Sequence, residues 1–234
     1  MTTNGKIKSV CLFALILFLV PVLIPGTSFS AVVSKSLDPI THGLKMPEDV
    51  AVSNDGKVYV VDGYQNKVLI YDKKGQPTGS ISIQKPTSVA VNNGFIYIGT
   101  NNDLSVKILD SSLQIIGSLG IGAKEFKLPR NIAVDKATGN VYVVDQLAHS
   151  IKVYTSNGTF ISNINDYPNL PQDVTITNNK IYVVDQPLIT DSWGGTIRGG
   201  QVQVFDMTGT PSGKFASYGT QEGQFIRPAG ITSD

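Results

Sequence analysis

A short motif that begins with proline recurs five times along this chain, and it constrains the fold more than any other feature of the sequence. The motif reads Pro-x-x-Val/Ile-Ala/Thr-Val/Ile in four copies and Pro-x-x-Ile-Thr-Ser in the last. The copies begin at Pro47, Pro86, Pro129, Pro171 and Pro228. They lie about 40 residues apart, with a longer final interval, and self-similarity at such a period is typical of repeat architectures.

Each of the first four repeats predicts four short β-strands. The first strand carries the motif and a Tyr-centred second strand follows it. Second strands are expected at 58–62, 96–100, 141–145 and 181–185. Third strands are expected at 68–72, 106–110, 151–155 and 202–206, and weaker fourth strands around 78–83, 114–119, 160–164 and 213–218. The 23 Gly and 12 Pro of the 234 residues also suit a turn-rich β protein.

A four-stranded sheet of this size cannot bury both faces alone, whereas radial stacking of such sheets buries them against each other. The sequence therefore predicts an all-β chain, a β-propeller of four-stranded antiparallel blades. The predicted blades are 46–84, 85–127, 128–169 and 170–225, and residues 226–234 are expected to open a fifth.

The units resemble the NHL repeat family, in which Pro-x-x-Val/Ile-Ala-Val precedes Val-Tyr-Val-x-Asp and then Asn-x-Val/Ile-x-x-Tyr/Phe. The first unit matches best, with its third strand opening at Asn66, and the resemblance covers residues 46–234. The second unit departs most, because Gly99-Thr100 replaces the usual Val-Asp. The family includes lyases, lactonase-like relatives and binding modules, so the resemblance predicts architecture and leaves activity open.

The resemblance is to the secreted, six-bladed type of NHL propeller, so it implies that this chain is truncated after four blades. Residues 31–45 would then supply the outer strand that closes the last blade of the complete ring. A closed four-bladed ring is the alternative.

Residues 1–30 are predicted to be a helical secretory signal peptide. Two lysines precede an apolar run over residues 10–24, and small residues follow near Ser30. The expected location is outside the cytoplasm: secreted, periplasmic or on the cell surface. An uncleaved segment that anchors the chain in a membrane is the alternative. The only cysteine, Cys11, lies in this segment, so a mature chain would contain no thiol for disulfides, metal ligation or catalysis.

One rim of the predicted propeller gathers oxygen-bearing side chains. First strands begin on this rim and, in a propeller, they line the central channel. The residues two positions after each proline are Asp49, Ser88, Asn131, Asp173 and Gly230. The first four carry side-chain oxygens, which suit a hard cation such as calcium, and the lactonase-like resemblance implies an axial calcium there. The alternative is that these side chains satisfy backbone N–H groups where strands begin.

Three aspartates end the second strands on the same rim: Asp62, Asp145 and Asp185. Because they recur at equivalent places, we expect them to be structural caps of the turns that come next in the chain.

No catalytic residue is predicted. The chain has two histidines, His42 and His149, whereas catalytic zinc, which the amidating-lyase members of the NHL group use, usually takes three protein ligands. Sequence motifs for nucleophilic or phosphate chemistry are also absent.

The fourth unit carries an insertion between its second and third strands, over residues 186–201. The corresponding connections of the other units, 63–67, 101–105 and 146–150, are much shorter. The insertion contains the only tryptophan, Trp193, with Asp191 and Arg198 nearby. Long loops on rigid scaffolds often carry binding residues, and Trp and Arg are favoured anchors. The alternative is a lid on the channel mouth, with Trp193 as local core.

These observations predict a non-catalytic binding module whose protein or glycan partner contacts the rim with the insertion. The alternative is a metal-assisted lyase or lactonase-like enzyme with an axial calcium and part of its site in further blades. A net charge of +1 argues against a nucleic-acid partner. A membrane partner is expected only if residues 1–30 stay attached.

Overall fold

The computed structural model describes residues 39–40, 43–121, 125–165, 168–191 and 193–233. Residues 1–30, with the predicted signal helix, and most of the predicted closing segment 31–45 lie outside this part, so those assignments stay predictions. Within the described residues, no helix is both long and apolar enough to cross a membrane. The described residues all belong to one compact unit, which starts at Leu37.

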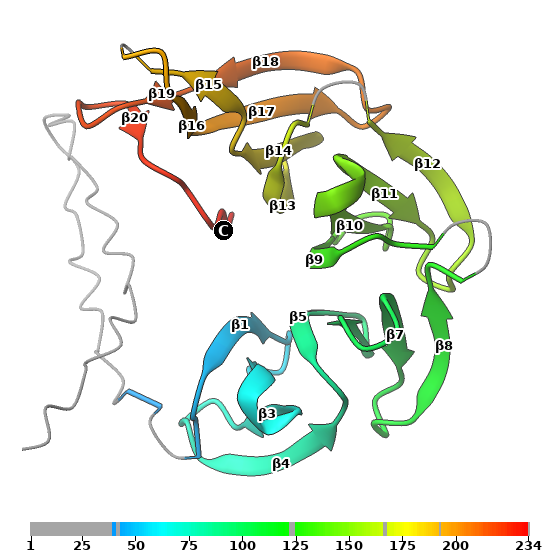
Figure 1. Cartoon of the computed structure of the whole chain (residues 1–234). Helices are drawn as coiled ribbons and strands as arrows, with labels where there is room; N and C mark the ends of the chain where they lie inside the picture. The colour runs from blue at the N-terminus through cyan, green and yellow to red at the C-terminus, as the bar shows by residue number, and fades with distance from the viewer. Residues whose placement is uncertain (1–38, 41–42, 122–124, 166–167, 192, 234) are drawn as a thin grey trace, which may run out of the picture. The chain divides into compact units, whose positions relative to one another are not determined.

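The described chain forms four antiparallel sheets of four strands each, one per predicted blade (Figure 1). The first comprises β1 (Pro47–Val52), β2 (Val58–Asp62), β3 (Lys67–Tyr71) and β4 (Pro77–Ser82), and the second β5 (Pro86–Asn92), β6 (Phe95–Thr100), β7 (Ser105–Leu109) and β8 (Ile115–Leu119). The third comprises β9 (Pro129–Val134), β10 (Val141–Asp145), β11 (Ser150–Tyr154) and β12 (Phe160–Ile164). The fourth comprises β13 (Pro171–Thr177), β14 (Lys180–Asp185), β17 (Gln201–Asp206) and β18 (Pro211–Phe215). These sheets confirm the all-β propeller prediction.

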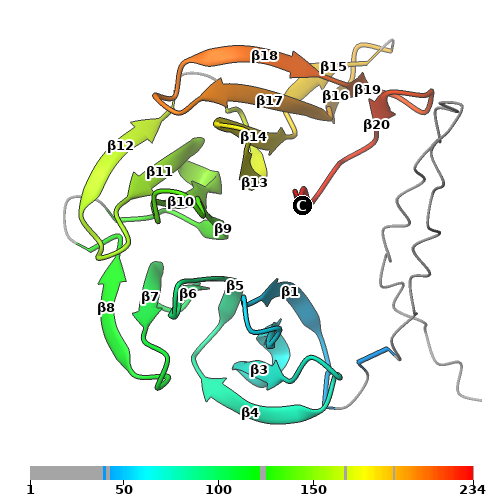
Figure 2. The ribbon, with the colours of Figure 1, turned by 180° about the vertical axis from the view of Figure 1, so that it is seen from behind.

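The blades follow one another around a common centre, with β1, β5, β9 and β13 innermost in both views (Figures 1 and 2). Alternate residues of each first strand point to opposite faces, so the second and third blades each pack on two neighbours. Between the first two blades, Tyr59 and Val61 of β2 pack with Val89 of β5 and Ile98 of β6. Equivalent apolar layers join the second blade to the third and the third to the fourth. The hydrophobic core therefore lies between blades.

Residues 226–233 do not form the predicted opening strand of a fifth blade, although they occupy its place. Ile231 N donates to Asp173 Oδ2 at 2.8 Å, just as Val89 N of the second blade donates to Asp49 Oδ2 at 2.8 Å. Gln186 Nε2 also donates to Pro228 O at 2.8 Å. The segment lacks strand pairing because no second strand among the described residues lies beside it.

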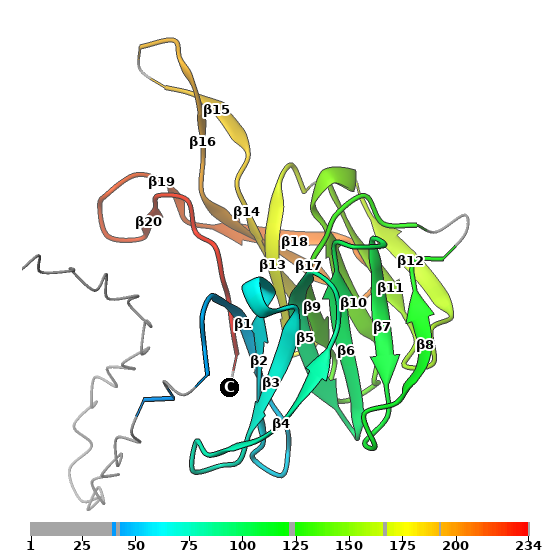
Figure 3. The same ribbon diagram turned by 60° about the horizontal axis from the view of Figure 1, so that its bottom comes forward.

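Two small sheets complete the fold. The predicted insertion contains the antiparallel pair β15 (Leu188–Thr190) and β16 (Thr196–Arg198). A parallel pair, β19 (Ser217–Tyr218) and β20 (Gln224–Phe225), comes after the fourth blade. Figure 3 shows the β15–β16 hairpin projecting away from the blades, with β19 and β20 near its base.

Candidate functional site

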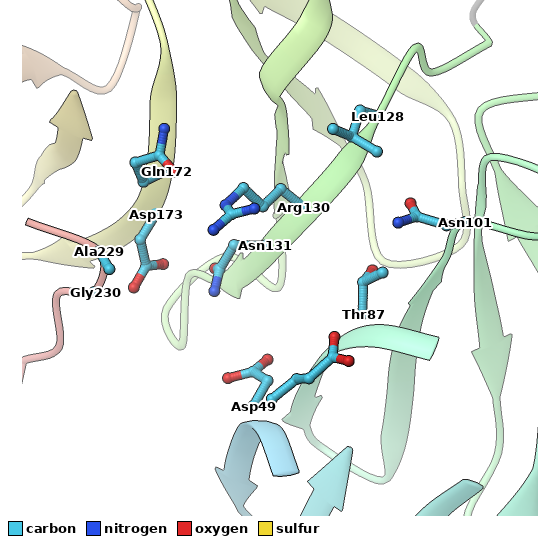
Figure 4. Close-up of a pocket in the computed structure, with 11 residues that line it drawn as sticks. Asp49, Thr87, Asn101, Leu128, Arg130, Asn131, Gln172, Asp173, Ala229 and Gly230 are labelled. Carbon is cyan, nitrogen blue, oxygen red and sulfur yellow. The ribbon is translucent and has the colours of Figure 1, made fainter. Parts of the chain in front are cut away.

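The first strands open onto a polar cavity of about 520 Å³. Each blade contributes the residues that follow its motif proline, so the cavity lies where the first strands begin. Its polar lining includes Glu48, Asp49, Thr87, Arg130, Asn131, Gln172 and Asp173. Figure 4 shows the side chains of Asp49, Asn131 and Asp173 directed toward a shared space, with Arg130 beside them. This cavity is the candidate functional site.

The structure brings together three of the four residues predicted to form an axial ring. Asp49, Asn131 and Asp173 line the cavity together with Gly230, whereas Ser88 does not. Ser88 is fully buried, and its Oγ has no hydrogen-bond partner among the described residues. In the second blade, Thr87 lines the cavity instead.

Both aspartates of the cavity satisfy backbone N–H groups, as the structural alternative predicts. Asp49 Oδ1 accepts from Val50 N at 2.8 Å and its Oδ2 from Val89 N. Asp173 repeats this arrangement, with Oδ1 accepting from Val174 N at 2.7 Å and Oδ2 from Ile231 N. Each carboxylate thus joins its first strand to the equivalent segment of the next repeat. The axial-calcium hypothesis stays a prediction.

Asp173 is buried and Asp49 is half-buried, and the charge of Asp49 acts on Asp173. Burial raises the pKa of Asp49 to about 6, against the effect of its two backbone hydrogen bonds. The pKa of Asp173 is raised to about 7: burial is the largest cause and the negative charge of Asp49 adds to it, against the effects of two backbone hydrogen bonds and of Arg130. At the cavity wall, burial and then the charge of Asp62 raise the pKa of Glu48. Ionised carboxylates are therefore unfavourable here without a positive partner.

The cavity offers a metal two carboxylates and one amide oxygen, from Asp49, Asp173 and Asn131. Three or more His, Cys, Asp or Glu side chains placed to hold a metal are not found together in the described residues. A calcium ion here would need amide, backbone or water oxygens for most of its ligands, since calcium usually takes six to eight.

The three predicted strand-end caps are fully buried, but they mainly fasten a different segment from the one expected. Asp62 Oδ2 accepts from Lys45 N at 2.6 Å and Met46 N at 3.2 Å, so it binds the chain that enters β1. Asp145 likewise accepts from Lys127 N and Leu128 N, and Asp185 from Asn169 N and Leu170 N.

The prediction that these aspartates cap the next turn is correct only for Asp62, which also accepts from Gln65 N at 3.1 Å. Asp145 makes no such bond. In the second blade Thr100 replaces the aspartate. The segment that enters this blade is held by the first blade instead, where Asn66 Oδ1 accepts from Lys85 N at 2.8 Å.

The insertion is an exposed hairpin and not a lid over buried aromatic core. Trp193 lies at the tip between β15 and β16 and is 93% exposed, which rules out the local-core alternative. Asp191, predicted to bind a partner, shapes the tip: its Oδ1 accepts from Trp193 N at 2.9 Å and Gly195 N at 2.7 Å. Arg198 ends β16, is exposed and pairs in register with Leu188.

The histidines do not contribute to the cavity. His42 lies outside the described residues. His149 is exposed, and its Nδ1 hydrogen-bonds to Asn169 O, on the segment that enters the fourth blade.

Comparisons with known proteins support the fold. No protein-family model matches the chain. A Caenorhabditis elegans protein described as a probable peptidyl-alpha-hydroxyglycine alpha-amidating lyase, pgal-1, is 28% identical over 118 residues, which cover 47% of this chain and 34% of that protein.

Two solved structures share the architecture. Hydrazine synthase of Kuenenia stuttgartiensis superposes with a TM-score of 0.61 at 18% identity, covering 82% of this chain and 52% of that one. A chain of a nidogen/laminin complex superposes with a TM-score of 0.57 at 16% identity, covering 74% and 64% respectively. The chain is thus a β-propeller protein, and it spans less than two thirds of each of these relatives.

Proposed function

We propose that this chain is an NHL-type propeller that acts outside the cytoplasm as a non-catalytic binding module. Its partner, a protein or a glycan, contacts the rim with the β15–β16 hairpin. The observation that carries the proposal is Trp193, a large apolar side chain 93% exposed at the tip of a projecting hairpin. The predicted signal peptide at residues 1–30 accounts for export, with the blades from residue 46 onward as the binding scaffold.

The hairpin tip is held in shape before any partner binds. Asp191 accepts from two backbone N–H groups, and Asp191 N donates to Gly195 O at 2.8 Å. Gly194 adopts a positive φ of 79°, which glycine does at little cost. A rigid aromatic anchor loses little conformational entropy on binding, which favours affinity. Arg198 and the exposed Leu188 extend the same surface along the two strands.

The first prediction is that Trp193→Ala abolishes partner binding and leaves stability nearly unchanged. Loss of a buried aromatic anchor from an interface typically costs about 2 kcal/mol or more. The measurement is pull-down from native extract and glycan-array binding, followed by titration of the purified partner, with thermal melts of each variant.

Tyr64→Ala is the matched control, because Tyr64 is an exposed aromatic residue on the short β2–β3 connection of the first blade. A variant with residues 188–198 replaced by a short turn should fold and fail to bind. If Trp193→Ala binds as tightly as wild type, or if Tyr64→Ala loses binding equally, the hairpin is not the binding surface.

A second candidate function, a metal-assisted lyase or lactonase-like enzyme, is favoured by the lyase description of the Caenorhabditis elegans relative and by the carboxylates in the cavity. It predicts that calcium raises the melting temperature, since a ligand of the native state stabilises it. The shift should vanish in Asp49→Asn/Asp173→Asn. An unchanged melting temperature at about 5 mM calcium rejects this candidate.

A further inference from the structure

The cavity contains two carboxylates that the fold does not require. The same position of the repeat, two residues after the motif proline, is Asp49, Ser88, Asn131 and Asp173 in the four blades. Neutral Ser88 and Asn131 occupy blades that pack through the same kind of apolar layers as the others. A neutral side chain therefore suffices for the fold, and the two acids remain to be explained.

The two carboxylates retain capacity for a ligand. Each oxygen of Asp49 and Asp173 accepts one backbone N–H, and a carboxylate oxygen has two lone pairs. Their burial makes the ionised forms costly in the free protein, as the raised pKa values of both show. Costly charged groups that converge on a cavity are typical of binding sites, because a ligand of opposite charge offsets the cost.

The cavity also presents a positive charge. Arg130 extends from β9 into the lining beside Asn131 (Figure 4). Its guanidinium is close enough to influence the pKa of both Asp173 and Glu48, but it belongs to none of the ion pairs found in the described residues. Arg130 thus faces the carboxylates of Glu48, Asp49 and Asp173 across one cavity, so the lining offers a ligand partners of both signs.

We propose that the cavity binds a small zwitterion of the α-amino-acid type, with its ammonium group between Asp49 and Asp173 and its carboxylate on Arg130. An ammonium group donates three hydrogen bonds, which matches the free lone pairs of two carboxylates, and a guanidinium binds a carboxylate in bidentate geometry. Gln172 and Asn131 provide amide groups for the remainder of the ligand. This site lies among the blades, so it is independent of the hairpin and of its partner.

The size and composition of the cavity fit this class of ligand. About 520 Å³ lies within the usual range for small-molecule sites. An organic cation is favoured over a bare metal, since no set of three metal-ligating acids or histidines occurs in the part of the chain that the structure describes.

The test uses the full chain and probes that separate the two charges. The common α-amino acids, each at about 10 mM, are screened by ligand-observed NMR and by thermal melts. L-alanine is compared directly with ethylamine, which lacks the carboxylate, and with propanoate, which lacks the ammonium. Calcium chloride forms a further arm. The variants are Asp49→Asn/Asp173→Asn and Arg130→Gln, with Asp55→Asn on the opposite rim as the matched control.

We expect at least one amino acid to bind wild type and the Asp55→Asn control, and neither single-charge counterpart to match it. Each cavity variant should weaken the apparent Kd about tenfold or more, since each leaves one ligand charge unpaired. The third blade has Asn131 at the position of Asp49 and Asp173, and the fourth has Gln172 at the position of Arg130, so the substituted residue types are compatible with the fold. Thermal melts of each variant verify that it is folded. Binding of no amino acid, equal binding by the variants, or a response to calcium alone overturns the proposal.

Discussion

At the scale of single residues, Gly99 in the second blade holds space that a buried serine needs. A Cβ at Gly99 would lie 2.4 Å from Ser88 Oγ and 3.1 Å from Thr87 Oγ1. The other units have valine at this place, opposite Asp49, Asn131 and Asp173 in register. The departure of the second unit from the repeat is therefore a packing consequence of Ser88, which turns away from the cavity that its counterparts line.

We predict that Gly99→Val destabilises the protein by about 1–3 kcal/mol, the usual cost of overpacking. Ser88→Ala removes the closest contact and a hydroxyl without a partner, so the double variant should regain much of the loss. Denaturant unfolding of both single variants and of the double variant measures this coupling.

Gly79→Val is the control, because a Cβ at Gly79 in β4 meets nothing within 4 Å. Equal destabilisation at both glycines, or additive effects of Gly99→Val and Ser88→Ala, would show that Ser88 does not set the requirement for glycine.

The sequence pattern predicted Asp49, Asn131 and Asp173 in the cavity lining but not the residue before each of them, and the backbone explains why. Strand alternation predicts that the second residue after each proline faces the channel and that the first one does not. A register irregularity follows the proline in all four first strands, between Pro47 and Asp49, Pro86 and Ser88, Pro129 and Asn131, and Pro171 and Asp173. Such a bulge interrupts alternation, so adjacent residues reach the same cavity. Glu48, Thr87, Arg130 and Gln172, polar in all four units, were the available signal.

At the scale of elements, one turn recurs between the third and fourth strands of the first, second and fourth blades. Asp72 Oδ1 accepts from Lys74 N and Gln76 N, and Gly75 has a φ of 79°. Asp206 makes the equivalent bonds to Thr208 N and Thr210 N. Asp110 does so as well, with Leu113 at a φ of 65° in place of glycine. The pKa of all three aspartates is lowered, mainly by the hydroxyl of Ser112 for Asp110, by the hydroxyl of Thr208 for Asp206 and by the backbone N–H of Gln76 for Asp72.

The projecting hairpin uses this same turn. Asp191 and Gly194 occupy the places of Asp72 and Gly75, with the same pattern of side-chain and backbone hydrogen bonds. The spacing Asp-x-x-Gly-x thus marks the tip of the insertion in the sequence. Strand periodicity alone does not reveal the hairpin, because β15 and β16 are only three residues long. The insertion was predictable as an interruption of the repeat, but its exposure depends on how the turn directs Trp193.

At the scale of the whole molecule, stability depends on how blades meet. The first strands of the second and third blades pack one face on the preceding blade and the other on the next one, so apolar residues occur at both alternations of the motif. Val50, on the face of β1 that no described blade covers, is exposed, whereas its counterparts Val89 and Ile132 are buried. The repeat predicted that the core lies between blades, because the apolar positions of the motif are nearly invariant between units. The hydrogen bonds that Asp49 and Asp173 accept from Val89 N and Ile231 N depend on the protonation state of the two carboxylates. Packing between repeats is therefore coupled to pH.

The last prediction concerns that coupling. A carboxylate whose pKa is raised on folding binds protons more tightly in the folded state, so its stabilising contribution is complete below the unfolded pKa, near 3.8, and is lost as pH rises through the folded value. For Asp49 and Asp173 those folded values are about 6 and about 7. We therefore expect the free energy of unfolding to fall between about pH 4 and 7, by on the order of a few kcal/mol, as both groups ionise.

Comparison with Asp49→Asn/Asp173→Asn isolates this effect, because the histidines and all other titrating groups are the same in both proteins. The pH dependence of the neutral variant over this window should be flatter. Its absolute stability is lowered at every pH, because each Asn has one acceptor oxygen for the two backbone N–H groups that each Asp binds. Arg130 and Glu48 are the other charged groups at the cavity, and they act in opposite directions: Arg130 lowers the pKa of Asp173, while ionised Glu48 would oppose further negative charge. Arg130→Gln should therefore steepen the loss of stability toward pH 8. Denaturant unfolding at half-unit pH steps measures the free energy of unfolding of all three proteins. Parallel pH curves for wild type and the neutral variant would show that the two carboxylates do not control packing between the blades.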